Sequence, residues 1–424
     1  MSVAKTVLIT GSNRGIGLAF TRHYVANGWK VIAAARDVEG ATDELAVSKV
    51  IPLDISDEVS IAKVAESLKG EPIDLLINNA GMGGGGGIPD VTKAEIMKLF
   101  EVNAVGPFLV TRALLPNLKL AVAKNGSATV GQVTSRMGSI ADNGSGGRYS
   151  YRASKSALNM LNKSLSIDLK DDKIITLALH PGYVFTRMTG HTGEVTTEES
   201  VAGLTKIIAN AKPEDSGKYF HFRGDILPCL SCPVQLMALA VFKIISLDVT
   251  DEDSITKAAE QLKGEPIDLL VNNAGMSSSS AGLLDVSKAD LMKLFEVNTV
   301  GPFLVTKAFL PNLKLAVAKH GSATVAQISS QRGSVAQNDT GGKYSYRTSK
   351  AALNMVNKSL AIDLNNDKIT TLALHPGYVV TRMTGHKGEV TPEESVAGLT
   401  KVIANAKLED SGRYLDFLGN TLPW

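Results

Sequence analysis

The strongest constraint on this 424-residue chain is that most of it occurs twice. Four motifs recur in the same order in both halves, at 76–82 and 270–276, 99–111 and 294–306, 149–155 and 344–350, and 177–184 and 372–379. The repeating unit is far longer than one supersecondary unit of a solenoid. The sequence therefore predicts two related domains that arose by tandem duplication.

The two copies are unequal in length. The segment VFKIISLDVTDEDS at 241–254 matches VSKVIPLDISDEVS at 47–60, and nothing in the second half matches residues 1–46. We expect a complete domain over 1–228, a junction over 229–242 and a truncated domain over 243–424. The second copy lacks whatever the first 46 residues supply.

Short apolar runs alternate with helical periods in the first copy. Strands are expected at Thr6–Thr10, Lys30–Ala34, Lys49–Leu53, Asp74–Ile77, Ala128–Val133, Ile174–Leu179 and Lys218–Phe222. Helices are expected near 15–27, 57–69, 92–123, 150–169 and 196–211. This order predicts an α/β protein with a doubly wound parallel sheet, followed by a second, incomplete copy of the same fold.

Composition and charge limit the classes of partner that the chain could bind. With 44 basic and 42 acidic residues the net charge is +2, and neither a basic run nor a long-range field favours nucleic acid or an anionic membrane. The charge-free stretch Ile226–Phe242 is interrupted by Pro228 and Pro233, so we interpret it as a junction rather than a membrane span. The N-terminal sequence lacks a secretory signal, and two cysteines offer no disulfide framework, so a cytoplasmic location is expected. Cys229 and Cys232 have no second ligand pair, and no metal site is predicted.

A glycine-rich turn follows the first predicted strand. In TGSNRGIG at 10–17, Gly11 permits a tight turn, Gly15 allows the backbone to approach a pyrophosphate, and Gly17 allows close packing of helix and strand. The N–H groups at the start of the helix then face the phosphates. Between a strand and a helix, this pattern indicates a dinucleotide-binding Rossmann fold.

The charge beside the ribose 2′ position selects the dinucleotide. The second strand ends at Arg36-Asp37, and Arg14 lies inside the glycine turn. Two guanidinium groups near one 2′-phosphate favour NADP(H). Asp37 is the opposing signal, and the alternative is that Arg36 pairs with Asp37 at the surface.

Several further motifs occur in order along the first copy, namely LDI at 53–55, NNAG at 78–81, Asn103 in FEVNAVGP, Ser135 in VTSRMG, YRASK at 151–155 and HPGYVFT at 180–186. Together with the glycine turn, they make the chain resemble the short-chain dehydrogenase/reductase family, and it is similar to the C-factor-like and sniffer-type carbonyl reductases. The closing segment SGRYLDFLGNTLPW also looks like the C-terminal strand and tail of that family.

The chemistry of the YRASK motif can be argued from the residues. Tyr151 and Lys155 are four apart on a predicted helix and so share a face. A free phenol is a poor acid at neutral pH, but an adjacent ammonium and a nicotinamide cation would both lower its pKa. Tyr151 would then give a proton to a carbonyl oxygen, or take one from an alcohol.

The resemblance implies the remaining roles. Lys155 would also hold the nicotinamide ribose, Ser135 would bind the substrate oxygen, and Asn103 would anchor a water between Lys155 and solvent. Thr134 and Ser139 are neighbouring alternatives to Ser135, while Tyr149 lacks a lysine four residues later. The cofactor-binding residues are expected to be Gly11, Asn13, Arg14, Gly15, Ile16, Gly17, Arg36, Asp54, Asn79, Ala80, Gly81, Tyr151, Lys155, Pro181, Gly182, Val184 and Thr186.

The second copy keeps the catalytic set but not the glycine turn. The retained residues are Asn298, Ser330, Tyr346 and Lys350. Without a helix N-terminus to hold the pyrophosphate, we expect this half to be catalytically silent. We also hypothesise that Val234–Leu247 forms a substitute strand beside Asp268–Val271.

The helices near 287–318 and 344–364 are those through which dimers of the family pair. They would allow the second half to pack on the first as an intra-chain pseudo-dimer, with a homo-oligomer as another possibility. The alternative is a fusion of neighbouring genes, or a gene-model error, that leaves a poorly folded tail.

The expected function is an NADP(H)-dependent oxidoreductase that acts on a small carbonyl or alcohol substrate at one site in the first copy. The alternative is a dinucleotide-binding sensor or scaffold whose second half carries an interaction surface.

Overall fold

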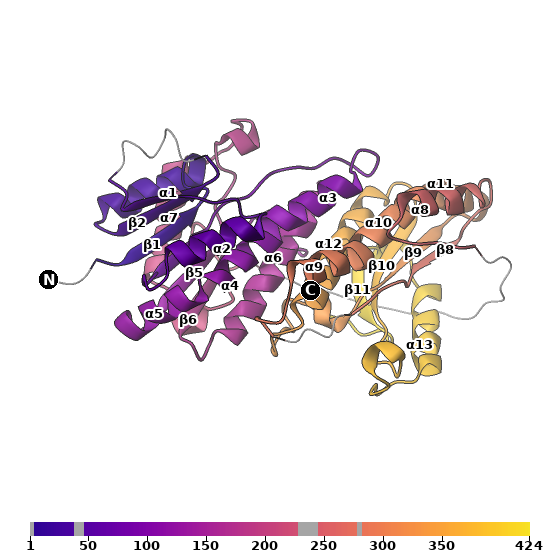
Figure 1. The fold of residues 1–424 in the computed structure, drawn as a ribbon. Helices are drawn as coiled ribbons and strands as arrows, with labels where there is room; N and C mark the ends of the chain where they lie inside the picture. Colours follow the sequence, from indigo (N-terminus) through magenta and orange to yellow (C-terminus); the bar gives the residue numbers. More distant parts are fainter. Residues whose placement is uncertain (1–3, 38–45, 228–244, 278–281) are drawn as a thin grey trace.

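A computed structural model of the chain describes residues 4–37, 46–227, 245–277 and 282–424 (Figure 1). The first half contains a seven-stranded parallel sheet with the strand order β3-β2-β1-β4-β5-β6-β7. Its strands are β1 Thr6–Thr10, β2 Lys30–Ala35, β3 Lys49–Pro52, β4 Leu75–Asn78, β5 Ala128–Val133, β6 Ile174–His180 and β7 Tyr219–His221. The predicted doubly wound α/β fold is confirmed.

Helices cover both faces of this sheet because its strands are apolar on both sides. Leu8 of β1 belongs to the same buried cluster as residues of the helices on one face, whereas Val7 and Ile9 pack with those of α1 and α7 on the other. The helices of the first half are α1 Gly15–Ala26, α2 Glu58–Ser67, α3 Lys93–Phe100, α4 Gly106–Ala113, α5 Leu115–Asn125, α6 Tyr149–Asp168 and α7 Thr197–Ala209.

The region expected as one helix over 92–123 is divided in the structure. A π-helical turn, Glu101–Val105, separates α3 from α4, and Leu114 separates α4 from α5. Pro116 lies in the first turn of α5, where its missing N–H is tolerated. Within the described ranges, no single helix is long and apolar enough to cross a membrane; by length and composition alone, Lys93–Ala113 and Leu115–Asn125, bent by 55°, pass together.

The second half has a four-stranded parallel sheet with the order β11-β10-β9-β8. Its elements are α8 Glu252–Glu260, β8 Leu269–Asn272, α9 Lys288–Phe295, the π-helical turn Glu296–Val300, α10 Gly301–Ala308, α11 Leu310–His320, β9 Ala323–Ile328, α12 Tyr344–Asp363, β10 Ile369–His375, α13 Pro392–Ala404 and β11 Arg413–Asp416. Among the described residues, β8 pairs with β9 alone and is an edge strand. Its counterpart in the first half, β4, pairs with β1 at the same edge.

The predicted junction, 229–242, lies entirely outside the described residues. Of the hypothesised substitute strand, 234–244 lie outside them, and 245–247 form no strand. The Cys229–Cys232 pair also lies outside them, and the domain limits at 228 and 243 stay predictions.

The two halves share one core. Helices α6 and α12 pack against each other at the centre of the molecule (Figure 1), and one buried apolar cluster draws residues from both halves. The rings of Phe100 and Phe295 are stacked with centroids 3.6 Å apart. Lys93 pairs with Glu296, and Lys288 pairs with Glu101. These contacts are reciprocal between equivalent helices, as in a two-fold dimer interface.

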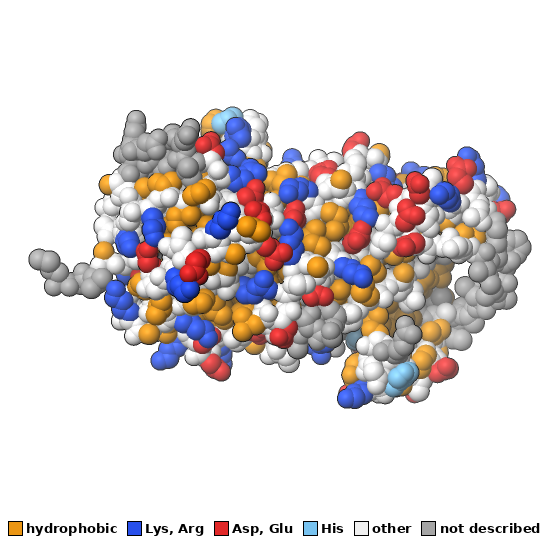
Figure 2. All heavy atoms as spheres, viewed as in Figure 1, with side chains coloured by type: hydrophobic (Ala, Val, Ile, Leu, Met, Phe, Trp, Pro, Cys, Tyr) orange, Lys and Arg blue, Asp and Glu red, His pale blue; other side chains and the backbone are white. Residues whose placement is uncertain are grey.

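The surface carries mixed charge. On the face seen in Figure 2, acidic and basic side chains are interspersed over both halves. This pattern agrees with the net charge of +2.

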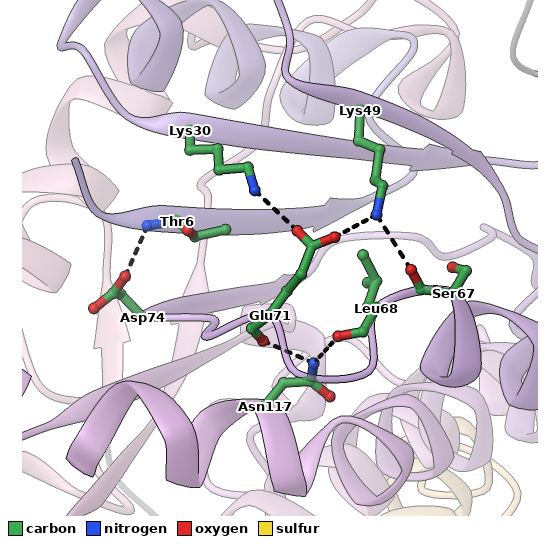
Figure 3. A network of polar contacts seen from close by, with 8 residues as sticks. All are labelled: Thr6, Lys30, Lys49, Ser67, Leu68, Glu71, Asp74 and Asn117. Carbon is green, nitrogen blue, oxygen red and sulfur yellow. Dashed lines mark hydrogen bonds and ion pairs between the residues drawn. The ribbon is translucent and has the colours of Figure 1, made fainter. Parts of the chain in front are cut away.

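A polar network ties the loop between α2 and β4 to the first three strands (Figure 3). Glu71 accepts a hydrogen bond from Lys30 Nζ at 2.9 Å and another from Lys49. Asn117 of α5 donates to the carbonyl oxygens of Leu68 and Glu71 at 2.6 and 2.8 Å. The network therefore fixes β2 and β3 to the body of the first half.

Candidate active site

The glycine turn has the shape that a pyrophosphate requires. Gly11 and Gly15 have φ angles of 64° and 53°, which side-chain-bearing residues rarely adopt. A Cβ atom at Gly17 would overlap the carbonyl oxygen of Gly11. Arg14, at the N-cap of α1, makes no side-chain hydrogen bond to the first turn. The N–H groups of that turn are therefore not capped by this side chain and can bind an anion.

Neighbouring strands hold this turn in place. Asn79 Nδ2 donates to the carbonyl oxygens of Thr10 and Gly11 at 2.9 and 3.1 Å, and Ala80 N donates to Thr10 Oγ1 at 3.0 Å. The methyl group of Thr186 would lie 3.7 Å from a Cβ at Gly15. The structure thus brings residues from three predicted cofactor motifs to one place.

The predicted 2′-phosphate side carries an exposed cation. The side chain of Arg36 is 71% exposed, and its Nη1 lies 3.9 Å from Asp54 Oδ2, so Arg36 forms an ion pair with Asp54. Burial acts to raise the pKa of Asp54, but hydrogen bonds from Ser56 and the charge of Arg36 hold it below the usual value. Asn13 Nδ2 donates to the carbonyl oxygen of Asp37 at 2.9 Å, which ties the turn to the end of β2.

The side chains of Tyr151 and Ser135 lie next to each other, where the substrate oxygen is predicted to bind. Tyr151 lies in the first turn of α6, Ser135 follows β5, and their side chains are hydrogen-bonded. Burial raises the pKa of Tyr151, while the Ser135 hydrogen bond and the charge of Arg148 lower it. The ammonium expected to lower this pKa is that of Lys155, whose Nζ lies 6.0 Å from the Tyr151 ring centroid. In the protein alone, burial outweighs the lowering effects.

Lys155 and Asn103 are both buried behind Tyr151. Lys155 Nζ donates to the carbonyl oxygen of Val133 at 2.9 Å, and burial lowers its pKa to about 8. Asn103 lies in the π-helical turn, where it exchanges hydrogen bonds with the backbone of Met82 at 2.8 and 2.9 Å. A Cβ at Gly81 would lie 3.1 Å from Asn103 Oδ1 and 3.7 Å from Lys155 Nζ, so Gly81 keeps this corner open.

The loop after β6 completes the predicted cradle. The carbonyl oxygen of Pro181 accepts a hydrogen bond from Ser200 Oγ at 2.7 Å, Gly182 has φ 85°, and Val184 bridges to Val195. Ile16 packs with the cluster on the α1 and α7 face of the sheet. These residues therefore shape the backbone around the site and make no contact of their own in the acid–base group described above.

The structure separates the candidate side chains from their neighbours. Thr134 Oγ1 donates to Asn159 Oδ1 at 2.7 Å and is buried, and Ser139 is also buried, whereas Ser135 is partly exposed. Sequence reasoning missed Tyr219, whose hydroxyl donates to the carbonyl oxygen of Ser135 at 2.5 Å. Its recurrence as Tyr414, which makes the equivalent bond to Ser330, was the available signal.

The second half reproduces the catalytic geometry. Asn298 exchanges the same hydrogen bonds with Met276, Lys350 Nζ donates to the carbonyl oxygen of Ile328 at 2.7 Å, and Tyr346 is hydrogen-bonded to Ser330. Burial lowers the pKa of Lys350 to about 8, as for Lys155. The glycine turn and its helix have no counterpart in the sequence of this half.

The described residues contain no group of His, Cys, Asp and Glu side chains that could hold a metal ion.

Comparison with known proteins identifies the family. The model of the family described as short chain dehydrogenase matches residues 5–196 and again residues 232–391. The chain therefore belongs to the short chain dehydrogenase family. The two matches support the tandem duplication.

Three relatives illustrate the likeness. "C-signal" of Myxococcus xanthus is 43% identical over 159 residues, which cover 38% of this chain and 93% of that protein. The "NADP-dependent (R)-specific alcohol dehydrogenase" of Lentilactobacillus kefiri is 31% identical and is matched over 43% of this chain and 74% of its own. The solved structure "Carbonyl reductase Sniffer of D. melanogaster" has a TM-score of 0.50 and 29% identity, covering 53% of this chain and 99% of that one.

Proposed function

We propose that this protein is an NADP(H)-dependent oxidoreductase that interconverts a small carbonyl compound and its alcohol at one working site, in the first half. The observation that carries the proposal is the convergence of the glycine turn after β1, Ser135 after β5, and Tyr151 and Lys155 of α6 at one edge of the parallel sheet. A nicotinamide dinucleotide, when bound, supplies or accepts the hydride.

The residues of this chain would handle the proton. In the reducing direction, the hydroxyl of Tyr151 donates its proton to the carbonyl oxygen, and Ser135 orients that oxygen. Lys155, held near the tyrosine by the carbonyl oxygen of Val133, stabilises the tyrosinate that forms. In the oxidising direction the tyrosinate takes the proton from the alcohol.

The preference for NADP(H) rests on Arg36 and Arg14. Both are exposed beside the glycine turn, and Arg36 is held by Asp54 rather than buried. The similar alcohol dehydrogenase of Lentilactobacillus kefiri is named as NADP-dependent, which supports the same choice here. An NADPH-versus-NADH binding titration tests this preference.

A matched pair of variants tests the activity. NADPH consumption is measured with a panel of carbonyl compounds in the parent, in Tyr151→Phe and in Tyr346→Phe. We expect Tyr151→Phe to abolish most of the rate and Tyr346→Phe to leave it unchanged. NADPH binding without consumption by the parent would favour the sensor or scaffold function, and an equal loss in both variants would contradict a single working site.

A further inference from the structure

The loop that joins Ser135 to Tyr151 is held by the second half of the chain. Ser135 begins this loop and Tyr149, at its end, is the first residue of α6. Asn143, buried in the middle of the loop, donates through Nδ2 to Ser359 Oγ of α12 at 2.8 Å. The hydroxyl of Tyr149 donates to Asp363 Oδ2, also on α12, at 2.6 Å.

The fit around these two bonds leaves the loop little freedom. A Cβ at Gly146 would overlap Asp363 Oδ1, so the loop backbone lies directly against the carboxylate. Arg152 of α6 also donates to the carbonyl oxygens of Gly146 and Gly147 at 3.0 and 3.1 Å. The loop is therefore clamped between its own helix and α12.

An apolar contact adds to this clamp. Ile140 is fully buried in a cluster whose other members all belong to the second half, namely Met355, Ala373, Tyr414, Leu422 and Trp424. Its counterpart Val335 is only half-buried. The loop of the first site is thus the more deeply covered of the two.

We infer that Ser359 and Asp363 are positioning residues for the site in the first half. By holding Asn143 in the middle of the loop and Tyr149 at its end, they fix the segment that joins Ser135 to Tyr151. This inference rests on the proposed function. It also gives the catalytically silent half a structural role, because that half would support the geometry of the working site.

The pseudo-symmetry of the chain supplies a matched control. Asn338 donates to Ser164 at 2.8 Å, and the hydroxyl of Tyr344 donates to Asp168 at 2.5 Å. Ser164 and Asp168 thus belong to the first half but support the loop of the second. If the support crosses the interface, damage to a residue in one half must disturb the site in the other.

The test compares Ser359→Ala/Asp363→Ala with Ser164→Ala/Asp168→Ala in the full chain. Each double variant removes two equivalent interface hydrogen bonds. We expect the first to lower kcat by about tenfold with an unchanged Kd for NADPH, because residues 139–148 include none of the predicted cofactor-binding residues. The second should keep the kcat of the parent. NADPH-binding stoichiometry corrects both for any unfolded fraction.

Hydrogen exchange gives a readout that does not require activity. Exchange should accelerate at residues 139–148 in the Ser359/Asp363 variant and at 334–343 in the Ser164/Asp168 variant. Should either double variant fail to fold, Tyr149→Phe and Tyr344→Phe remove one hydroxyl each. Equal kcat in the paired variants, or unchanged exchange at 139–148, would overturn the inference. A parent that consumes no NADPH would instead refute the proposed function, and the exchange experiment would still decide the support of the loop.

Discussion

The two halves differ at one edge of the sheet and agree almost everywhere else. Ile77 of β4 lies between β1 and β5 and is fully buried, whereas its counterpart Val271 of β8 is 43% exposed. Val201 of α7 packs with α1 and is 2% exposed, whereas its counterpart Val396 of α13 is 60% exposed. The lack of a counterpart of residues 1–46 therefore leaves apolar surface exposed in the second half.

The catalytic side chains are unaffected by this loss. Lys155 and Lys350 donate to equivalent carbonyl oxygens, and Asn103 and Asn298 make equivalent bonds to Met82 and Met276. Val133 and Ile328 end β5 and β9, and Met82 and Met276 follow β4 and β8, so none of these supports comes from the strands that the second half lacks. The candidate acid–base group and the predicted coenzyme cradle are therefore separately supported parts of the fold.

Replacing Lys155 and Lys350 one at a time tests whether the two halves differ in activity. Lys155→Met should lower kcat by about 10²–10⁴-fold, because the proton-transfer step loses its cation, while Lys350→Met should leave kcat unchanged. Both variants lose one buried hydrogen bond, so their thermal melting should shift alike. A comparable loss of kcat in Lys350→Met would mean that the second half is also active.

The coenzyme cradle can be closed without touching the acid–base group. Gly17→Ala places a methyl group against the carbonyl oxygen of Gly11 and should raise the Kd for NADPH by about ten- to hundredfold. Gly144→Ala is the control, because a Cβ there meets no atom within 4 Å. Calorimetric titration measures both, and an unchanged Kd in Gly17→Ala would place the coenzyme elsewhere.

Arg36 is one of the two exposed arginines on which the proposed preference for NADP(H) rests. Arg36→Ala should raise the Kd for NADPH by about tenfold and leave that for NADH nearly unchanged, because only the former carries the 2′-phosphate. Parallel titrations with both coenzymes distinguish this from a general loss of binding. A similar weakening of both would show that Arg36 acts on the shape of the site.

The prediction with the smallest effect concerns the free energy of unfolding. It involves Glu71, which lies at the end of the strands opposite the candidate site. Hydrogen bonds from Lys49 and Lys30 lower the pKa of Glu71 from its ordinary 4.5, so their stabilisation is present above that pH and is lost as the pH falls through the folded-state pKa. Glu71→Gln should cost about 0.5–1 kcal/mol at pH 7 and less at pH 3. Urea unfolding at both pH values measures this difference.

The counterpart Glu265 provides the control for that experiment. It is exposed and makes no ion pair with any described residue. Because the second half has no counterpart of Lys30, Glu265→Gln should cost less unfolding free energy at pH 7 than Glu71→Gln. A loss equal to that of Glu71→Gln would assign the effect to the charge itself rather than to its lysine partners.

Local features could be predicted well from the sequence. The bounds of β1 and β5 agree with prediction because both are short runs that contain several β-branched residues. The four-residue spacing of Tyr151 and Lys155 places them together on α6. The π-helical turn was not foreseen, since the apolar periodicity over 92–123 is compatible with one helix. It is this turn that holds Asn103.

Long-range partners were beyond sequence reasoning. The sequence distinguishes Tyr149 from Tyr151 by the lack of a lysine four residues later, but the bond of Tyr149 to Asp363, 214 residues away, depends on how the two halves pack. The pKa of Tyr151 was expected to fall, yet burial raises it in the protein alone. Both outcomes depend on tertiary packing, which no residue pattern in a single sequence encodes directly.

The stacked rings of Phe100 and Phe295 lie where equivalent helices meet. In a dimer of identical chains, any substitution at such a position would appear on both sides at once. Here each ring is encoded by its own codon, so a mutation alters one side while the other stays constant. Natural selection can therefore adjust the two surfaces independently, a freedom that a homodimer lacks.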